Sequence, residues 1–557
     1  MAILNDDYKK KLGDLRHKEE EELATILSKK YGLQYVDLTG IPINTDALRL
    51  VSEKEAREKK LAPFKILGKK LSIAVLSPKN DATMAIVKGL EERNYQPILY
   101  MVSTKSLERA WERYKDITFA HETKEGVLDV SNEDIRNIVE KTRGLGEAKK
   151  VIQEVIGLKR GYRISRIVET IVAAGIATDA SDIHIEPEES YIRLRLRLNG
   201  ILTDVLNFDR ETYELLLSRI KLLSGLKLNI KEKPQDGRFS IKISDAEIEI
   251  RSSTLPGAYG ESVVMRILNP ESISVPMEEL GMDPDFLKVV EKEISRPNGM
   301  ILNTGPTGSG KTTTLYAFLK KAHTPEVKII TIEDPIEYHL PGIVQTQVDV
   351  KNGYTFAGGL RSALRQDPDI IMVGEIRDKE TAEIAINAAL TGHLVFSTLH
   401  TNNAAGTFPR LIDLGVNSKL ITSAINISMA QRLVRKLCQD CREEITPSPE
   451  QRKILDKVIP TLPKEKVLQT EKVWAPRGCD NCNKSGYRGR IGVFEAIISD
   501  ESIEKVVEDN PSEREITKAA EGQKILSMLQ DGIIKVLSGV TTFEELQRVL
   551  DFEEETI

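Results

Sequence analysis

Long apolar runs are absent from this chain of 557 residues, and no window approaches the roughly 20 apolar residues that span a bilayer. The N-terminal stretch MAILNDDYKKKLGDL carries charges where a signal peptide needs its apolar core, so export is not expected. These two absences predict a cytoplasmic protein. Any association with a membrane is expected to be peripheral and to run through a protein partner.

An excess of positive charge is also missing, because 79 basic residues stand against 85 acidic ones and the formal net charge is −6. Such a chain has no overall field to attract a polyphosphate backbone, so no nucleic-acid partner is expected. Internal repeats and low-complexity tracts are absent too. The balance of 40% hydrophobic and 29% charged residues is typical of soluble globular domains, and the length predicts three or four of them.

The hydrophobic pattern changes three times along the chain and predicts four segments. Residues 1–115 mix helical stretches with short strand-like runs, as in a small α/β or α+β domain. Residues 116–154 are charged and weakly periodic, which suits a linker with one helical piece. Residues 155–270 combine an amphipathic helix with alternating strands and predict a second N-terminal α+β domain. Residues 271–557 form the fourth segment.

Short, fully apolar runs alternate with helical stretches in the fourth segment. The runs lie at 299–302, 327–332, 370–373 and 394–396. Strands that are apolar on both faces are typical of a parallel sheet covered by helices on both sides. The segment is therefore predicted to be an α/β domain with a parallel sheet.

A glycine-rich loop connects the first of these runs to the helical stretch TTTLYAFLKKA. It fits the pattern G-x-x-x-x-G-K-[ST] at every required position. Converging backbone N–H groups, a helix N-terminus and a lysine form a phosphate cradle, and a following threonine holds Mg2+. The predicted nucleotide-binding residues are Gly305, Pro306, Thr307, Gly308, Ser309, Gly310, Lys311, Thr312 and Thr313.

Acidic residues follow two other apolar strands of the same segment. Glu375 follows the apolar run 370–373 within the stretch 369–378, which has the general form of a Walker B segment, and Glu333 lies in the acidic cluster 331–337. Strand C-terminal ends meet at the ligand crevice of such sheets, so both clusters can reach one phosphate. Taken alone, either could also be a solvated acidic turn.

Two of the seven histidines, His393 and His400, bracket one strand-like run. Spacing does not assign them a role, and a histidine in this setting is often a structural hydrogen-bonding residue. Both a structural and a functional role therefore stay open for each of them.

All four cysteines fall into two C-x-x-C pairs. Two such loops are what a tetrahedral four-cysteine site for Zn2+ requires, and the long separation of the pairs predicts a small insertion at about 435–490. An Fe–S site and unmetallated thiols are the alternatives. The predicted ligands are Cys438, Cys441, Cys479 and Cys482.

The ordered motifs resemble those of the type II secretion and type IV pilus assembly ATPases, the GspE-like and PilB-like motors, over about residues 155–550. The stretch ASDIHIEP at 180–187 is similar to the opening of that family's second N-terminal domain, GPTGSGKTTT to its Walker A, TIEDPIE to its Asp box, IIMVGEIRD to its Walker B and GHLVFSTLHTN to its His box. The resemblance implies a RecA-like P-loop NTPase core preceded by α+β domains. It also implies hydrolysis of ATP with Mg2+ to power pilus assembly or the related secretion pseudopilus.

The resemblance implies roles for individual residues as well. Glu333 would be the general base, Glu375 would support Mg2+, and His400 would sense the γ-phosphate, although the division between the two glutamates stays open. Family members work as homo-hexamers whose second N-terminal domain presents arginines to a neighbour's nucleotide. The period-two arginines of the stretch 192–198 fit this role, with a solvated strand face as the alternative. The candidates are Arg193, Arg195, Arg197 and Arg210, with Arg238 and Arg251 as weaker ones.

Partners are implied in the same way. The first N-terminal domain would dock on inner-membrane platform components of the assembly machinery, at the inner face of the membrane. Cyclic di-GMP binding is doubtful, because only KLGDL at 11–15 resembles the start of the dinucleotide motif. The tetracysteine insertion is typical of assembly-type motors rather than retraction motors. The competing interpretations are a nucleic-acid translocase, which would need a basic channel, and a non-hydrolysing nucleotide-binding scaffold.

Overall fold

The computed structural model describes residues 20–552 apart from 42, 49, 68, 93–94, 117–120, 123–126, 130–137, 139–141, 143, 158–162, 244–245, 270–274 and 467–470. The chain divides into two compact units. One comprises Met1–Asp134 with Glu154–Glu169, and the other comprises Ile135–Gln153 with Thr170–Ile557.

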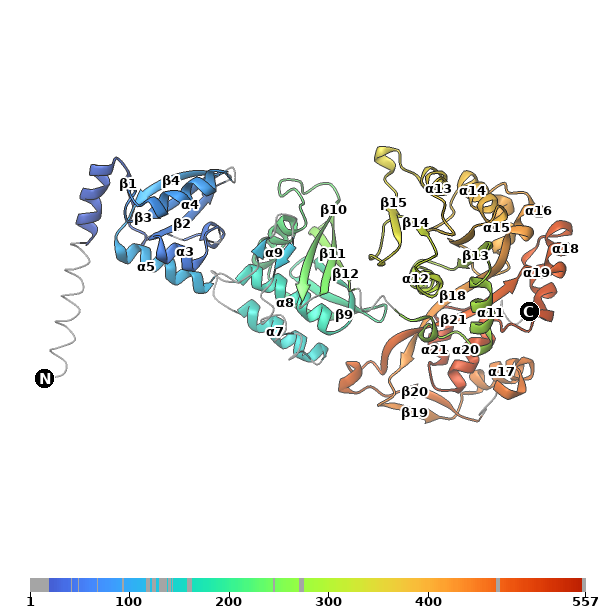
Figure 1. The fold of residues 1–557 in the computed structure, drawn as a ribbon. Coiled ribbons are helices and arrows are strands. Elements are labelled where there is room, and N and C mark those ends of the chain that lie inside the picture. The colour runs from blue at the N-terminus through green and yellow to red at the C-terminus, as the bar shows by residue number, and fades with distance from the viewer. Residues whose placement is uncertain are drawn as a thin grey trace. The chain divides into compact units, whose positions relative to one another are not determined.

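The first unit contains a four-stranded sheet in the order β1-β4-β3-β2 (Figure 1). Leu71 and Ile73 of β3 and Leu107 of α5 are fully buried in its core, so this small sheet is stabilised by apolar packing. Its strands are β1 (Gln34–Tyr35), β2 (Leu61–Leu67), β3 (Lys70–Val75) and β4 (Gln96–Met101). The same unit also contains β5 (His121–Glu122) and β6 (Val127–Asp129), which pair antiparallel with each other. Its helices are residues 20–31, α2 (Thr45–Leu48), α3 (Glu53–Glu58), α4 (Asp81–Glu92) and α5 (Thr104–Glu112).

An antiparallel sheet with the order β10-β11-β12-β7-β8-β9 opens the second unit. In β8, Ile192, Leu194 and Leu196 are buried while the arginines between them are partly exposed, which confirms the predicted period-two alternation. The strands are β7 (Ala180–Pro187), β8 (Ile192–Leu198), β9 (Ile201–Phe208), β10 (Gln235–Ile243), β11 (Ala246–Gly257) and β12 (Gly260–Leu268). The helix α9 (Arg210–Leu223) belongs to this unit, whereas α7 (Leu145–Gly157) and α8 (Arg163–Ala177) each have residues in both units.

A seven-stranded sheet in the order β15-β14-β16-β17-β13-β18-β21 forms the rest of this unit, with helices on both of its sides (Figure 1). All its neighbouring strands are parallel except β18 and β21. Met300 and Leu302 of β13 pack into one hydrophobic cluster and Ile301 into another, so both faces of the sheet are covered. This confirms the predicted parallel sheet between two layers of helices.

The bounds of its elements follow the apolar runs of the sequence. The strands are β13 (Gly299–Thr304), β14 (Ile329–Glu333), β15 (Val344–Gln347), β16 (Ile370–Val373), β17 (Leu394–Leu399), β18 (Ile425–Leu437) and β21 (Tyr487–Ile498). The helices are α11 (Pro284–Ile294), α12 (Lys311–Ala322), α13 (Phe356–Leu364), α14 (Lys379–Leu390), α15 (Thr407–Asp413), α16 (Ser418–Ala424), α18 (Glu501–Asp509), α19 (Glu513–Ala520), α20 (Met528–Leu537) and α21 (Phe543–Gln547).

The segment between the two cysteine pairs forms the small insertion that their spacing predicts. It contains the antiparallel pair of β19 (Arg442–Ile445) and β20 (Val473–Pro476) together with α17 (Pro449–Val458). Ser448 caps α17 by accepting a hydrogen bond from the backbone N–H of Gln451, whose side chain bonds back to the Ser448 N–H. The insertion therefore brings the second cysteine pair back to the first through its own ordered elements.

Candidate active site

The glycine-rich loop lies between β13 and α12, in the strand-loop-helix context that its pattern requires. Gly305 has a φ of +145° and Gly310 a φ of +92°. A Cβ at Gly305 would lie 2.6 Å from the Gln431 carbonyl oxygen, and one at Gly310 would lie 2.8 Å from the Gln431 Nε2. Both positions therefore need glycine, for conformation and for space.

Lys311 begins α12 and bends back over the loop. Its Nζ donates to the carbonyl oxygens of Gly305, at 2.7 Å, and Pro306, at 3.1 Å. Burial lowers the pKa of the Lys311 amine, while the charge of Glu375 acts in the opposite direction. The ammonium thus stands at the mouth of the phosphate loop with a carboxylate within electrostatic reach.

Glu375 comes directly after β16, and its side chain is 14% exposed. One carboxylate oxygen forms an ion pair with Arg377, and the other lies 3.4 Å from the Nε2 of His400, which follows β17. The strands β16, β17 and β13 are parallel neighbours in that order. Their C-terminal ends lie at one edge of the sheet, which brings Lys311, Glu375 and His400 to the same edge.

Glu333 has a different environment at the end of β14. It is 2% exposed, and its carboxylate accepts hydrogen bonds from the Tyr316 hydroxyl, the Thr331 hydroxyl and the Gln345 Nε2. Burial raises the pKa of the Glu333 carboxyl despite these bonds. Sequence reasoning missed Tyr316 and Gln345, although a tyrosine inside an otherwise apolar turn of α12 is a signal for a buried polar partner.

The two histidines of the His box have different surroundings. The ring Nδ1 of His393 lies 3.1 Å from the carbonyl oxygen of Ala388, before β17 begins. His400, at the opposite end of that strand, is 51% exposed and faces Glu375. The structure thus gives His393 a structural hydrogen bond and places His400 at the candidate site.

The arginines of β8 are paired inside their own sheet. Arg193 lies 2.8 Å from Glu188, Arg195 lies 2.5 Å from Glu186, and Arg197 lies 3.3 Å from Asp182. Arg210, the first residue of α9, donates to backbone carbonyl oxygens of the turns between β7 and β8 and between β11 and β12, those of Glu188, Glu189 and Tyr259. A role of these four arginines at a neighbour's nucleotide stays a prediction.

Arg251 is the candidate arginine that reaches the nucleotide-binding half of this unit. From β11 it donates to the carbonyl oxygen of Ile336, and its Nη1 lies 3.3 Å from a carboxylate oxygen of Glu337. Both partners belong to the acidic cluster that follows β14. Arg238, by contrast, is 72% exposed and lies 3.6 Å from Glu249.

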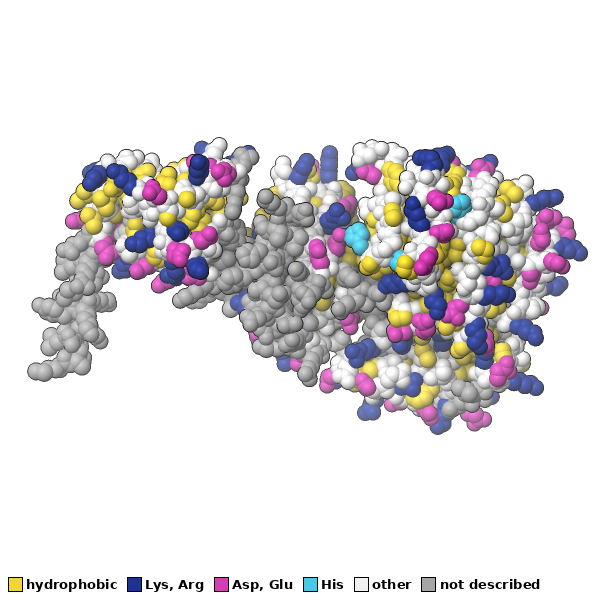
Figure 2. Space-filling view, viewed as in Figure 1, with side chains coloured by type: hydrophobic (Ala, Val, Ile, Leu, Met, Phe, Trp, Pro, Cys, Tyr) yellow, Lys and Arg dark blue, Asp and Glu magenta, His cyan; other side chains and the backbone are white. Residues whose placement is uncertain are grey.

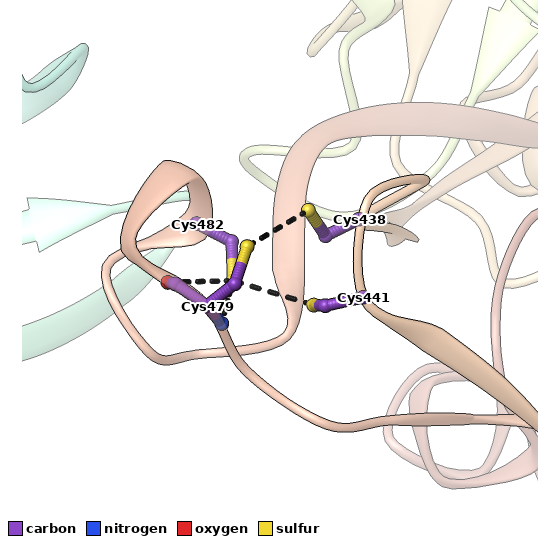
Figure 3. A group of neighbouring side chains, drawn as sticks. All are labelled: Cys438, Cys441, Cys479 and Cys482. Atoms are coloured by element: carbon purple, nitrogen blue, oxygen red, sulfur yellow. Dashed lines mark hydrogen bonds between the residues drawn. The ribbon is translucent and has the colours of Figure 1, made fainter.

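The four cysteines form a single cluster (Figure 3). The Sγ atoms of Cys438 and Cys479 are 3.8 Å apart, and those of Cys441 and Cys482 are 3.7 Å apart. A tetrahedron with metal–sulfur bonds of about 2.3 Å has sulfur separations of about 3.8 Å. Burial acts to raise the pKa of Cys482, but N–H donation from Cys479 and Gly486 contributes to lowering it to about 7. The cluster can hold a metal ion.

The fold and the site define a P-loop ATPase, with the phosphate loop, an acidic strand end and a histidine assembled on one parallel sheet. The family model described as "Type II/IV secretion system protein" matches residues 159–548, and the chain belongs to this family. A second model, "MshEN domain", matches residues 31–121. Residues 11–15, on which the doubt about cyclic di-GMP rests, lie outside the described residues.

Several curated proteins are similar to this chain. Type II secretion system protein E of Dickeya dadantii is 45% identical over 386 residues, which cover 69% of this chain and 75% of that protein. The type IV pilus assembly ATPase PilB of Myxococcus xanthus is 36% identical over 531 residues, covering 95% and 91%. The solved ATPase DotB of Legionella pneumophila shares the fold, with a TM-score of 0.51 at 22% identity, covering 71% and 97%. The chain is an ATPase of the secretion and pilus assembly class, as its motifs predict.

Proposed function

We propose that this ATPase works as a homo-hexameric motor that converts Mg2+-dependent ATP hydrolysis into movement of a pilus or secretion pseudopilus. The observation that carries the proposal is the convergence of Lys311, Glu375 and His400 at the C-terminal ends of three adjacent parallel strands. A lysine, a carboxylate and a histidine placed around one phosphate loop provide for binding, water activation and sensing of the γ-phosphate.

The site residues take the following roles in this proposal. The N–H groups of residues 305 and 307–313 and the Lys311 ammonium bind the β- and γ-phosphates, and the exposed Thr312 hydroxyl would hold Mg2+, whose charge would neutralise that of the phosphates. Glu375 orients the attacking water and supports the metal. His400, within 3.4 Å of Glu375, contacts the γ-phosphate.

Glu333 is given a supporting role because its carboxylate oxygens already accept three hydrogen bonds. Its bond to Tyr316 connects β14 to α12, the helix that carries Lys311. Glu333 therefore holds the acidic cluster of residues 331–337 against the phosphate-binding helix. The general-base role that the family resemblance implies for Glu333 is the alternative, and a comparison of Glu333→Gln with Glu375→Gln distinguishes the two.

Arg251 is proposed to couple the antiparallel sheet to the nucleotide site. Replacing Arg251 with alanine is expected to lower kcat of the assembled enzyme about tenfold, with less than about a threefold change in ATP affinity, because a charge-assisted contact to Ile336 and Glu337 is lost. Steady-state kinetics and nucleotide titration measure the two quantities.

The matched comparison is the triple replacement of Arg193, Arg195 and Arg197 by glutamine, assayed at the same protein concentration. If the triple variant has lower turnover than wild type in the assembled enzyme but not in the unassembled enzyme, the three arginines act at a neighbour's nucleotide. Full turnover would make them a solvated strand face held by carboxylates.

Wild-type kinetics of Arg251→Ala would contradict the coupling role of Arg251.

Zn2+ is proposed as the metal of the cysteine cluster. Four sulfurs that lie within 4.8 Å of one another, with separations of 3.7 and 3.8 Å between the two pairs, suit tetrahedral zinc, and two backbone N–H groups donate to Cys482. When bound, zinc supplies a structural crosslink between the end of β18 and the start of β21. The cluster lies outside the proposed nucleotide site, so its role is stability rather than chemistry.

The proposed partners are other copies of this chain and the inner-membrane platform of the machine. No described helix is both long and apolar enough to cross a bilayer. Peripheral attachment at the cytoplasmic face through protein partners is proposed from the similarity to secretion and pilus assembly ATPases. On the face shown in Figure 2, basic and acidic side chains are interspersed, which supports the proposal that nucleic acid is not a partner.

The decisive experiment measures phosphate release from ATP by the purified oligomer with and without Mg2+. Turnover is expected only with Mg2+, and Lys311→Ala should abolish both binding and turnover because the phosphates lose their cation. Adding single- or double-stranded DNA should leave the rate unchanged. Strong stimulation by DNA would favour the translocase, and absence of hydrolysis would favour the nucleotide-binding scaffold.

A further inference from the structure

The loop that follows His400 is anchored mainly through its backbone. The His400 side chain is half exposed, so packing alone does not fix its direction. Thr304, the last residue of β13, accepts the N–H of Thr401 at 2.8 Å and donates to the carbonyl oxygen of Leu399. The position of the imidazole therefore depends on how the backbone of residues 400–406 is held.

Glu495 of β21 holds the middle of this loop. Its Oε1 accepts the backbone N–H of Ala404 at 2.8 Å, and its Oε2 accepts the N–H of Met528, the first residue of α20, at 3.2 Å. Each carboxylate oxygen is thus used by a different segment of the chain. A neutral amide has a single acceptor oxygen, and its NH2 group would face one of these N–H donors.

Arg432 of β18 holds the same loop from another side. It is 9% exposed, its Nη2 donates to the carbonyl oxygen of Asn402 at 2.6 Å, and its Nη1 donates to the carbonyl oxygen of Gln431 at 3.1 Å. Its charge acts on both Lys311 and Glu495. A Cβ at Gly305 would lie 3.2 Å from the same Nη1, so this arginine also lies against the phosphate loop.

We propose that Glu495, together with Arg432, is a positioning residue for His400 that fixes the following loop relative to the phosphate loop and to α20. The inference rests on the proposed role of His400 at the γ-phosphate. Glu495 acts through its hydrogen bond to the backbone of Ala404 rather than through direct contact with substrate. The same carboxylate links the nucleotide site to the C-terminal helices through Met528.

The test compares binding of ATPγS with binding of ADP by titration calorimetry on the full chain with Mg2+. Glu495→Gln is expected to weaken ATPγS binding about tenfold while changing ADP binding less than about twofold, because only the ligand with a γ-phosphate meets His400. A merely structural role would weaken both ligands alike. Turnover should fall about tenfold with little change in KM.

Three further variants keep the result interpretable. His400→Ala should lose the same preference for ATPγS over ADP. Arg432→Lys keeps the charge but replaces the two separate Nη donors by a single nitrogen, so it should lose part of the preference. It provides an independent test if Glu495→Gln does not fold. Glu293→Gln removes another buried carboxylate, paired with Arg296 at 2.8 Å, and should change Tm without changing the preference.

The outcomes separate this inference from the function on which it rests. If His400→Ala loses the preference while Glu495→Gln and Arg432→Lys both keep it, the positioning role is overturned. If His400→Ala itself keeps the preference, the proposed role of His400 fails, and the positioning role fails with it. The expected result is that His400→Ala, Glu495→Gln and Arg432→Lys lose the preference for ATPγS over ADP, whereas Glu293→Gln keeps it.

Discussion

Glu375→Gln is expected to leave ATP bound while lowering kcat about a thousandfold, because an amide of equal size can neither accept a proton nor hold a negative charge beside the metal. The variant also loses its ion pair with Arg377 and the contact between its carboxylate and His400. Mg2+-dependent phosphate release measures the turnover, and titration with a fluorescent ATP analogue measures binding. Affinity within about threefold of wild type is expected, since Lys311 and the loop N–H groups are unchanged.

Glu333→Gln is the matched variant, since it makes the same chemical change at the end of β14, the neighbour of β16 in the sheet. A drop of about tenfold in kcat is expected, together with a lower Tm, because a buried acceptor of three hydrogen bonds is weakened. If Glu333→Gln were instead the more severe variant, Glu333 would be the general base and Glu375 its helper. Normal turnover by Glu375→Gln would remove that residue from the mechanism.

Replacing Cys479 with serine is expected to reduce bound zinc from about one atom per chain to nearly none and to unfold the insertion between β18 and β21. Structural zinc sites have apparent binding free energies of about 10–16 kcal/mol at neutral pH, so losing one ligand removes a large part of the insertion's stability. Metal analysis of the purified protein and thermal unfolding measure the two effects. Chelation of wild-type protein should reproduce both of them.

Ser448→Ala provides the control within the same insertion. It removes the N-cap of α17 and should cost about 1 kcal/mol of stability without affecting the metal. A Tm loss in Cys479→Ser no greater than that of Ser448→Ala would mean that the metal contributes little. Iron in place of zinc, or no metal in the wild-type protein, would contradict the zinc assignment.

Features carried by neighbouring residues were predictable from the sequence. The phosphate loop occupies consecutive positions between a buried strand and a helix, so its pattern alone specifies its conformation. The alternation in β8 follows from the period of a strand, and the two cysteine pairs indicate their cluster through spacing. The loop, the strand and each C-x-x-C pair carry their information within a few residues of the chain.

The relative roles of the acidic residues were not predictable in the same way. Glu333 and Glu375 both follow apolar strands, yet one is buried against Tyr316 and Gln345 while the other faces Lys311 and His400. Likewise, the regular arginines of β8 attract attention in the sequence, but Arg251 of β11 is the one in contact with Ile336 and Glu337.

The sequence by itself determined the class of this protein and the positions of its glycine-rich loop and its two C-x-x-C pairs, because each of these motifs depends on local spacing. Only the tertiary structure decided which side chains share the site. Glu495 and Arg432 meet the loop after His400 from strands about 30 to 90 residues away along the chain. Such encounters depend on strand order and on the register between strands, which arise from the packing of the whole sheet rather than from any short stretch of residues.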